Sequence, residues 1–149
     1  MSYLRIICID KPKGWTSFDV VRFVKRQFQE KKVGHLGTLD PMATGVLPVF
    51  LGQATRLIPL FNNVDKTYRA ICKFGESTDT YDAEGTVTQT LDPSFLNQQE
   101  VTKAVYSFLG QQEQQTPAFS AAKVNGVPSY KLARKGLKVP VKIRPVTFH

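Results

Sequence analysis

The feature that most limits the fold is a helix start signal near the N-terminus. Thr16 and Asp19 stand three residues apart, the spacing of a capping box, in which each side chain accepts a hydrogen bond from the other residue's backbone amide. Apolar side chains then follow at helical spacing: Phe18, Val21, Val24 and Phe28. The pattern predicts a helix that runs to about Gln29 and buries this face.

Strand-like patterns lie on both sides of this helix. The apolar run 6–9 predicts a short buried strand, and the run 46–51 predicts another, in which Pro48 favours an edge position or a break in pairing. The later segments are assigned in the same way. Helices are predicted over 53–61, with Leu57, Leu60 and Phe61 buried, and over 99–109. Strands are predicted over 66–74, 86–91 and 139–149, with an acidic turn or loop over 76–85 and a polar strand or linker over 111–115.

Composition narrows the class of protein. With 149 residues the chain has the length of one domain, and 42% hydrophobic with 21% charged residues is typical of a globular protein. The net charge of +8 indicates a polyanionic partner such as nucleic acid, or simply a basic protein without one. Cys8 and Cys72 lie far apart in apolar runs, so we expect two small buried side chains in a reducing compartment. We find no signal-peptide core and no membrane span, and expect a cytoplasmic protein.

One loop carries the clearest chemical signal. Between the first helix and the run 46–51, two glycines bracket His35 and Leu36, and Pro41 stiffens the backbone of Asp40. A carboxylate on a rigid loop is a typical catalytic arrangement. The alternative is a tight turn in which Asp40 caps backbone amides and His35 has no role. The glycines do not form a Walker loop, because the Gly-Lys-Ser/Thr ending is absent.

Several blocks together resemble the TruB family of tRNA pseudouridine synthases. The most specific is the loop itself, Gly34-His35-Leu36-Gly37-Thr38-Leu39-Asp40-Pro41. The other blocks follow the family's order along the chain: 10–17 (DKPKGWTS), 42–48 (MATGVLP), 52–56 (GQATR), 65–69 (DKTYR), 78–85 (TDTYDAEG) and 115–117 (QTP). The resemblance covers nearly all of the chain.

The resemblance implies an α+β fold with a mixed, largely antiparallel sheet flanked by helices. It implies an isomerase that converts uridine 55 in the T loop of tRNA to pseudouridine without metal or cofactor. By the same resemblance Asp40 matches the catalytic aspartate, His35 the histidine that contacts the substrate nucleotide, and Tyr68 the tyrosine that stacks on the flipped base. From its pattern alone, Tyr68 is a half-buried strand aromatic.

A basic segment resembles the family's RNA-gripping insertion, near residues 116–140. Its candidate RNA-binding residues are Lys123, Lys131, Arg134 and Lys135, with Tyr130 able to pack or stack. The alternative is a solvated amphipathic helix around 129–135.

The chain departs from the family in length. Residues 1–149 match the N-terminal part of the catalytic domain, and the family's later Lys-Gly-Thr-Tyr-Ile-Arg block and C-terminal RNA-binding domain are not in this sequence. We therefore expect a fragment of a longer protein that is inactive alone. Two other functions stay open: a non-catalytic RNA-binding or tRNA-folding module, and a guide-RNA-dependent pseudouridine synthase.

Overall fold

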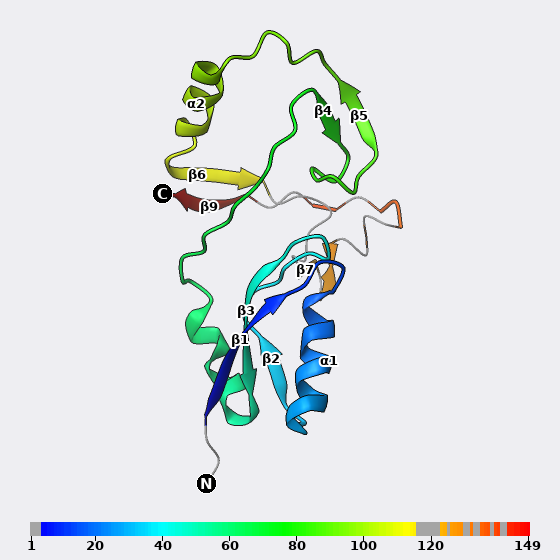
Figure 1. Cartoon of the computed structure of the whole chain (residues 1–149), viewed down its shortest axis with the longest axis vertical. Coiled ribbons are helices and arrows are strands. Elements are labelled where there is room, and N and C mark those ends of the chain that lie inside the picture. The colour runs from blue at the N-terminus through cyan, green and yellow to red at the C-terminus, as the bar shows by residue number, and fades with distance from the viewer. Residues whose placement is uncertain are drawn as a thin grey trace. The chain divides into compact units, whose positions relative to one another are not determined.

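The computed structural model describes residues 4–115, 123–124, 126–129, 132, 135–137, 139–140 and 143–149. The chain divides into two compact units, Met1–Arg69 and Ala70–His149, each with its own paired strands (Figure 1). Within the described ranges, no helix has the length and apolar character needed to cross a membrane.

An antiparallel sheet of three strands is the framework of the first unit. Strands β1 (Arg5–Lys11) and β2 (Val33–His35) both pair with β3 (Gly45–Leu51), which lies between them. Helix α1 (Ser17–Phe28) packs on this sheet, and the 3-10 helix η1 (Gly52–Phe61) follows β3 directly. The strands predicted over 6–9 and 46–51 are confirmed.

Pro48 lies in the central strand, so the expected edge position is wrong. Its carbonyl accepts a hydrogen bond of 2.9 Å from the amide of Leu36. The N–H and C=O of one residue in an antiparallel strand face the same neighbour, so the missing N–H of Pro48 also faces this side. The register between β2 and β3 ends with His35 opposite Val49. Beyond it, Leu36 and Pro48 share a single hydrogen bond, because proline has no N–H to donate in return. Pro48 therefore stands where pairing with β2 breaks off, which was the other expectation.

The capping box of α1 is confirmed. The hydroxyl of Thr16 accepts from the amide of Asp19 at 3.1 Å, and the Asp19 carboxylate accepts from the amide of Thr16 at 2.8 Å. The Thr16 hydroxyl first, then Arg22, lower the pKa of Asp19 from 3.8 to about 2. Because the pKa is lowered, the cap stabilises the fold fully above pH 3.8 and less as the pH falls toward 2. The helix ends at Gln29, which adopts a left-handed conformation with φ of 50°.

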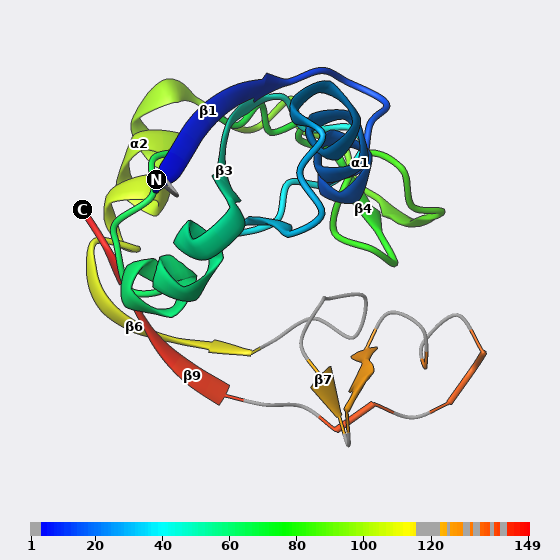
Figure 2. The ribbon, with the colours of Figure 1, turned by 90° about the horizontal axis from the view of Figure 1, so that it is seen from below.

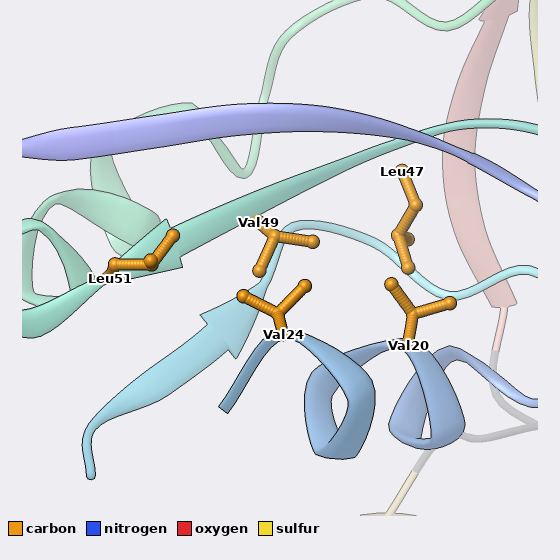
Figure 3. Close-up of a cluster of buried hydrophobic side chains, with 5 residues drawn as sticks. All are labelled: Val20, Val24, Leu47, Val49 and Leu51. Carbon is orange, nitrogen blue, oxygen red and sulfur yellow. The ribbon is translucent and has the colours of Figure 1, made fainter. Parts of the chain in front are cut away.

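The core of the first unit joins α1 to β3. Val20 and Val24 point toward Leu47 and Val49, and Leu51 lies at the far end of the strand (Figure 3). The expected inclusion of Phe18 and Phe28 is wrong, because these rings are 59% and 44% exposed. The buried residues of α1 are Ser17, Val20, Val21 and Val24, an i, i+3, i+4, i+7 stripe that Phe18 lies beside.

Only one face of β1 is covered, which corrects the expectation of a buried strand. Ile7 and Ile9 are half-buried and Lys11 is fully buried, whereas the alternate residues Ile6 and Cys8 are exposed. Cys72 is exposed as well, so the expected burial of both cysteines is wrong. An apolar run does not show which of its two faces finds a partner.

Two expectations for the segments that follow β3 also need correction. The helix over 53–61 exists as η1, but its buried residue is Ala54; Leu57 is only half-buried and Leu60 is 77% exposed. The segment 66–74 is not a strand, and its residues are exposed. An extended segment becomes a strand only when a neighbour completes its ladder, and none of the described strands does so.

In the part of the second unit that the structure describes, antiparallel strand pairs accompany the helix α2. Strand β4 (Glu76–Thr78) pairs with β5 (Val87–Thr90), β6 (Gly110–Gln115) with β9 (Ile143–Phe148), and β7 (Lys123–Val124) with β8 (Val127–Pro128). Helix α2 (Gln98–Tyr106) has its own capping box, from Asn97 and Glu100. The glutamine-rich segment 111–115 is thus a strand, and Figure 2 shows β6 and β9 side by side.

The acidic turn or loop expected over 76–85 is found only over 79–85, because residues 76–78 form β4. Asp82 accepts hydrogen bonds from the Thr80 hydroxyl at 2.7 Å and the Glu84 amide at 2.9 Å. Asp79 accepts from the Thr86 amide at 2.8 Å. The fold is α+β, and every strand pair among the described residues is antiparallel, as expected for a largely antiparallel protein.

The core assignment predicts different costs for two neighbouring substitutions. Val24→Ala should lower the free energy of unfolding by about 1–3 kcal/mol, because it removes buried methyl groups and leaves a cavity. Phe18→Ala removes a larger but mostly exposed side chain and should cost less than about 1 kcal/mol. Urea denaturation of both variants measures the difference. A larger loss for Phe18→Ala would contradict this core.

Candidate functional site

Two glycines, one in β2 and one in the loop between β2 and β3, matter for different reasons. At Gly34 a Cβ would lie 2.8 Å from Ile58 Cδ1, so a larger residue there would require the Ile58 side chain to move. Gly37 has a φ of +72°, a conformation that other residues rarely adopt. The first glycine therefore leaves room for the Ile58 side chain of η1, and the second allows a left-handed backbone conformation in the loop.

His35 is the last residue of β2, and its ring folds back on the loop. Nδ1 forms a hydrogen bond with the carbonyl of Gly37, two residues on. Because a carbonyl can only accept, Nδ1 carries the proton, and in the neutral ring Nε2 is left as an acceptor. The half-buried side chain therefore has one fixed nitrogen and one available for a ligand.

Asp40 combines a fixed backbone with a free side chain. Its carbonyl accepts from the amide of Ala43 at 3.0 Å, which closes a turn. The next carbonyl, of Pro41, accepts from the amide of Gly14 at 2.7 Å, so this loop is joined to the segment after β1. The carboxylate is exposed, and no hydrogen bond to it comes from the described part of the chain. Asp40 does not cap backbone amides with its side chain, so the tight-turn alternative is wrong in that respect.

Lys11 joins the same two segments from inside the protein. Its side chain is fully buried, and its Nζ donates to the carbonyls of Pro12 at 3.1 Å, Trp15 at 2.6 Å and Pro41 at 3.4 Å. An ammonium group has three N–H donors, so all three are used. A buried charge without such partners would be strongly destabilising. Lys11 therefore requires these three carbonyls to converge.

Ser17 attaches the other end of the loop to α1. Its hydroxyl accepts from the amide of Leu39 at 2.9 Å and donates to the carbonyl of Leu39 at 3.1 Å. Ser17 is 3% exposed. Sequence reasoning assigned no role to Ser17 or to Lys11. The signal available was their position in the block 10–17, but nothing in that block shows that both side chains turn inward.

Two of the predicted site residues lie close in sequence within the first unit. His35 is the last residue of β2, and Asp40 lies in the loop that follows it. Tyr68 is 69% exposed and outside any strand, so the alternative of a half-buried strand aromatic is wrong. Tyr68 has no aromatic or hydrogen-bond contact with the loop among the described residues.

The predicted RNA-binding residues are described only in part. Lys123 begins β7, and Lys135 is exposed. Lys131, Arg134 and Tyr130 lie outside the described residues, as does most of the predicted amphipathic helix. Their roles stay predictions.

Comparison with known proteins gives a consistent family. A family model described as "TruB family pseudouridylate synthase (N terminal domain)" matches residues 25–149. Among similar curated proteins, the tRNA pseudouridine synthase B of Syntrophotalea carbinolica is 48% identical over 143 residues, 96% of this chain and 47% of that protein. The protein of the same name from Saccharophagus degradans is 46% identical over 97% of this chain and 46% of its own length. The chain thus spans about half the length of these relatives.

A solved structure supports the fold. In a crystal structure of a Cbf5-Nop10-Gar1 complex, one chain matches with a TM-score of 0.57 and 24% sequence identity. The match covers 95% of the chain described here and 32% of the other. At this level of identity the likeness concerns the fold alone.

Proposed function

The chain belongs to the TruB family of pseudouridylate synthases, and from this premise we propose that it carries the aspartate-bearing part of an enzyme that converts uridine to pseudouridine in tRNA. The observation that carries the proposal is the loop 34–41. It holds the Asp40 backbone through hydrogen bonds on both sides and leaves the carboxylate exposed to a substrate.

The proposed reaction is a rearrangement within one nucleotide. The C1′–N1 glycosidic bond of uridine breaks, the uracil turns, and a C1′–C5 bond forms. The C5 proton leaves at the end and N1 gains one, so the product is an isomer of the substrate. The Asp40 carboxylate can attack a carbon of the nucleotide or accept a proton, and either role requires an unpaired anionic oxygen. An exposed carboxylate on a fixed backbone meets that requirement.

Two further side chains have proposed roles in holding the nucleotide. A uridine in a folded loop must leave its stack to reach Asp40, and an exposed aromatic ring such as Tyr68 can hold it by stacking, for about 1–3 kcal/mol per base. His35 has Nε2 available to accept a hydrogen bond from the nucleotide. Neither role requires a metal or a cofactor.

The proposed substrate is uridine 55 in the T loop of tRNA, in the cytoplasm. The support is the name shared by the relatives that are 46–48% identical to this chain, tRNA pseudouridine synthase B. The net charge of +8 suits a polyanionic substrate. We further propose that Lys123, Lys131, Arg134 and Lys135 contact its phosphates.

Replacing the proposed catalytic carboxylate tests this function directly. In the full-length protein, Asp40→Asn should reduce the rate of pseudouridine formation at least about 100-fold. The reason is that the substitution removes the carboxylate that acts as nucleophile, acid or base. Binding of tRNA should survive, since the substitution keeps the size of the side chain. The measurement is tritium release from T-loop RNA labelled with [5-³H]uridine.

A matched control for this substitution is Asp10→Asn. Asp10 is another exposed aspartate of the first unit, on β1. It should turn over at the rate of the unsubstituted protein. If Asp40→Asn turned over as fast as Asp10→Asn, the catalytic assignment would be wrong, and a non-catalytic RNA-binding module would then be the better description.

The RNA-binding proposal predicts a change in salt dependence. The slope of log affinity against log salt concentration reflects the number of phosphates that the protein contacts. Neutralising Lys131, Arg134 and Lys135 together should reduce this slope by the amount expected for the loss of up to about three phosphate contacts. Neutralising the exposed residues Arg26, Lys73 and Lys103 should change it less. Filter binding of tRNA at several salt concentrations measures both slopes. Equal slopes for the two triple variants would place the RNA elsewhere.

A further inference from the structure

Ser17 makes an unusual connection for the first residue of a helix. Side chains at this position are commonly exposed, but Ser17 is 3% exposed and faces the loop that carries Asp40. Its single oxygen accepts from the amide of Leu39 at 2.9 Å and donates to the carbonyl of the same residue at 3.1 Å. The Ser17 hydroxyl thus both donates a hydrogen bond to Leu39 and accepts one from it, and Leu39 is the residue directly before Asp40.

Fixing the carbonyl of Leu39 also fixes the start of Asp40. The peptide group is planar, so the Leu39 carbonyl lies in one plane with the amide nitrogen and Cα of Asp40. Because Ser17 holds the Leu39 carbonyl in one direction, it also fixes the orientation of the peptide plane from which the Asp40 side chain extends. Leu39 cannot shift freely either, because its side chain packs against the core cluster of α1 and β3.

On its other side Asp40 is held by a different segment. The carbonyl of Pro41 accepts from the amide of Gly14 at 2.7 Å and from Lys11 Nζ at 3.4 Å. The carboxylate has no hydrogen bond from the described residues that would orient it directly. Its position therefore depends on the backbone anchors at Leu39 and Pro41, and Ser17 supplies the first of them.

We propose that Ser17 is a positioning residue for Asp40, and this inference rests on the proposed function. The hydroxyl of Ser17 couples the N-terminus of α1 to the Leu39–Asp40 peptide and holds the carboxylate in reach of the flipped nucleotide. A displacement of about 1 Å is enough to slow an enzymatic step by about 100-fold. Loss of the Ser17 hydroxyl should therefore reduce turnover more than it reduces RNA binding.

The test compares two neighbouring variants of the full-length protein. Ser17→Ala should lower kcat by about 10- to 100-fold and leave KM for T-loop RNA within about threefold. It should also speed hydrogen exchange of the Leu39 amide. Thr16→Ala is the matched control, because it removes the N-cap of the same helix without touching Leu39. Its kcat should stay near that of the unsubstituted protein at a temperature where all variants are folded.

A third variant distinguishes loss of the hydroxyl from general damage to the fold as the cause of a lower kcat. Ser17→Thr retains the hydroxyl and should restore most of the lost kcat. The inference is overturned if Ser17→Ala and Thr16→Ala have equal kcat, or if Ser17→Thr is as slow as Ser17→Ala. These failures differ from failure of the proposed function, in which the unsubstituted protein itself would release no tritium from labelled uridine.

Discussion

The arrangement of the site depends on one buried cation. Lys11 comes at the end of β1 and directs its ammonium group to carbonyls of Pro12, Trp15 and Pro41. Burying an ammonium group is costly unless its donors are satisfied, so the two segments that supply these carbonyls must come together wherever Lys11 is buried. The turn after β1 and the loop before β3 are about 30 residues apart in sequence, and this contact makes them one structure.

Around that contact the backbone near Asp40 is held by hydrogen bonds, whereas the side chains proposed to meet the substrate are not. The backbone near Asp40 is held at Leu39 by Ser17 and at Pro41 by Gly14 and Lys11. The groups that we propose to act on the nucleotide, the Asp40 carboxylate and the second nitrogen of His35, have no hydrogen-bond partner among the described residues. A preorganised backbone with free functional atoms suits a reaction in which one carboxylate must meet a nucleotide taken out of its stack. This suits the TruB family membership of the chain.

Local rules predicted the elements whose causes are local. The capping box of Thr16 and Asp19 fixed the start of α1 because both partners lie within one turn. Features that depend on a distant partner were missed or wrong. Of the two positions expected for Pro48, the edge was wrong and the break in pairing was found. The segment 66–74 was expected to pair, and Cys8 was expected to be buried. Lys11 shows the limit most clearly, because its burial requires carbonyls from two separate segments, and a lysine after a strand is otherwise typical of a surface.

The most direct test of this account is the amide exchange rate of Gly14 in Lys11→Met, compared with Lys13→Met, in the full-length protein. Methionine keeps the apolar length of the side chain but removes the hydrogen bonds that Lys11 Nζ donates to the carbonyls of Pro12, Trp15 and Pro41. If Lys11 holds the two segments together, the Gly14 amide should exchange at least about 10-fold faster in Lys11→Met, equivalent to about 1.4 kcal/mol. It should be unchanged in Lys13→Met, since Lys13 is exposed. Equal protection of Gly14 in both variants would contradict the account.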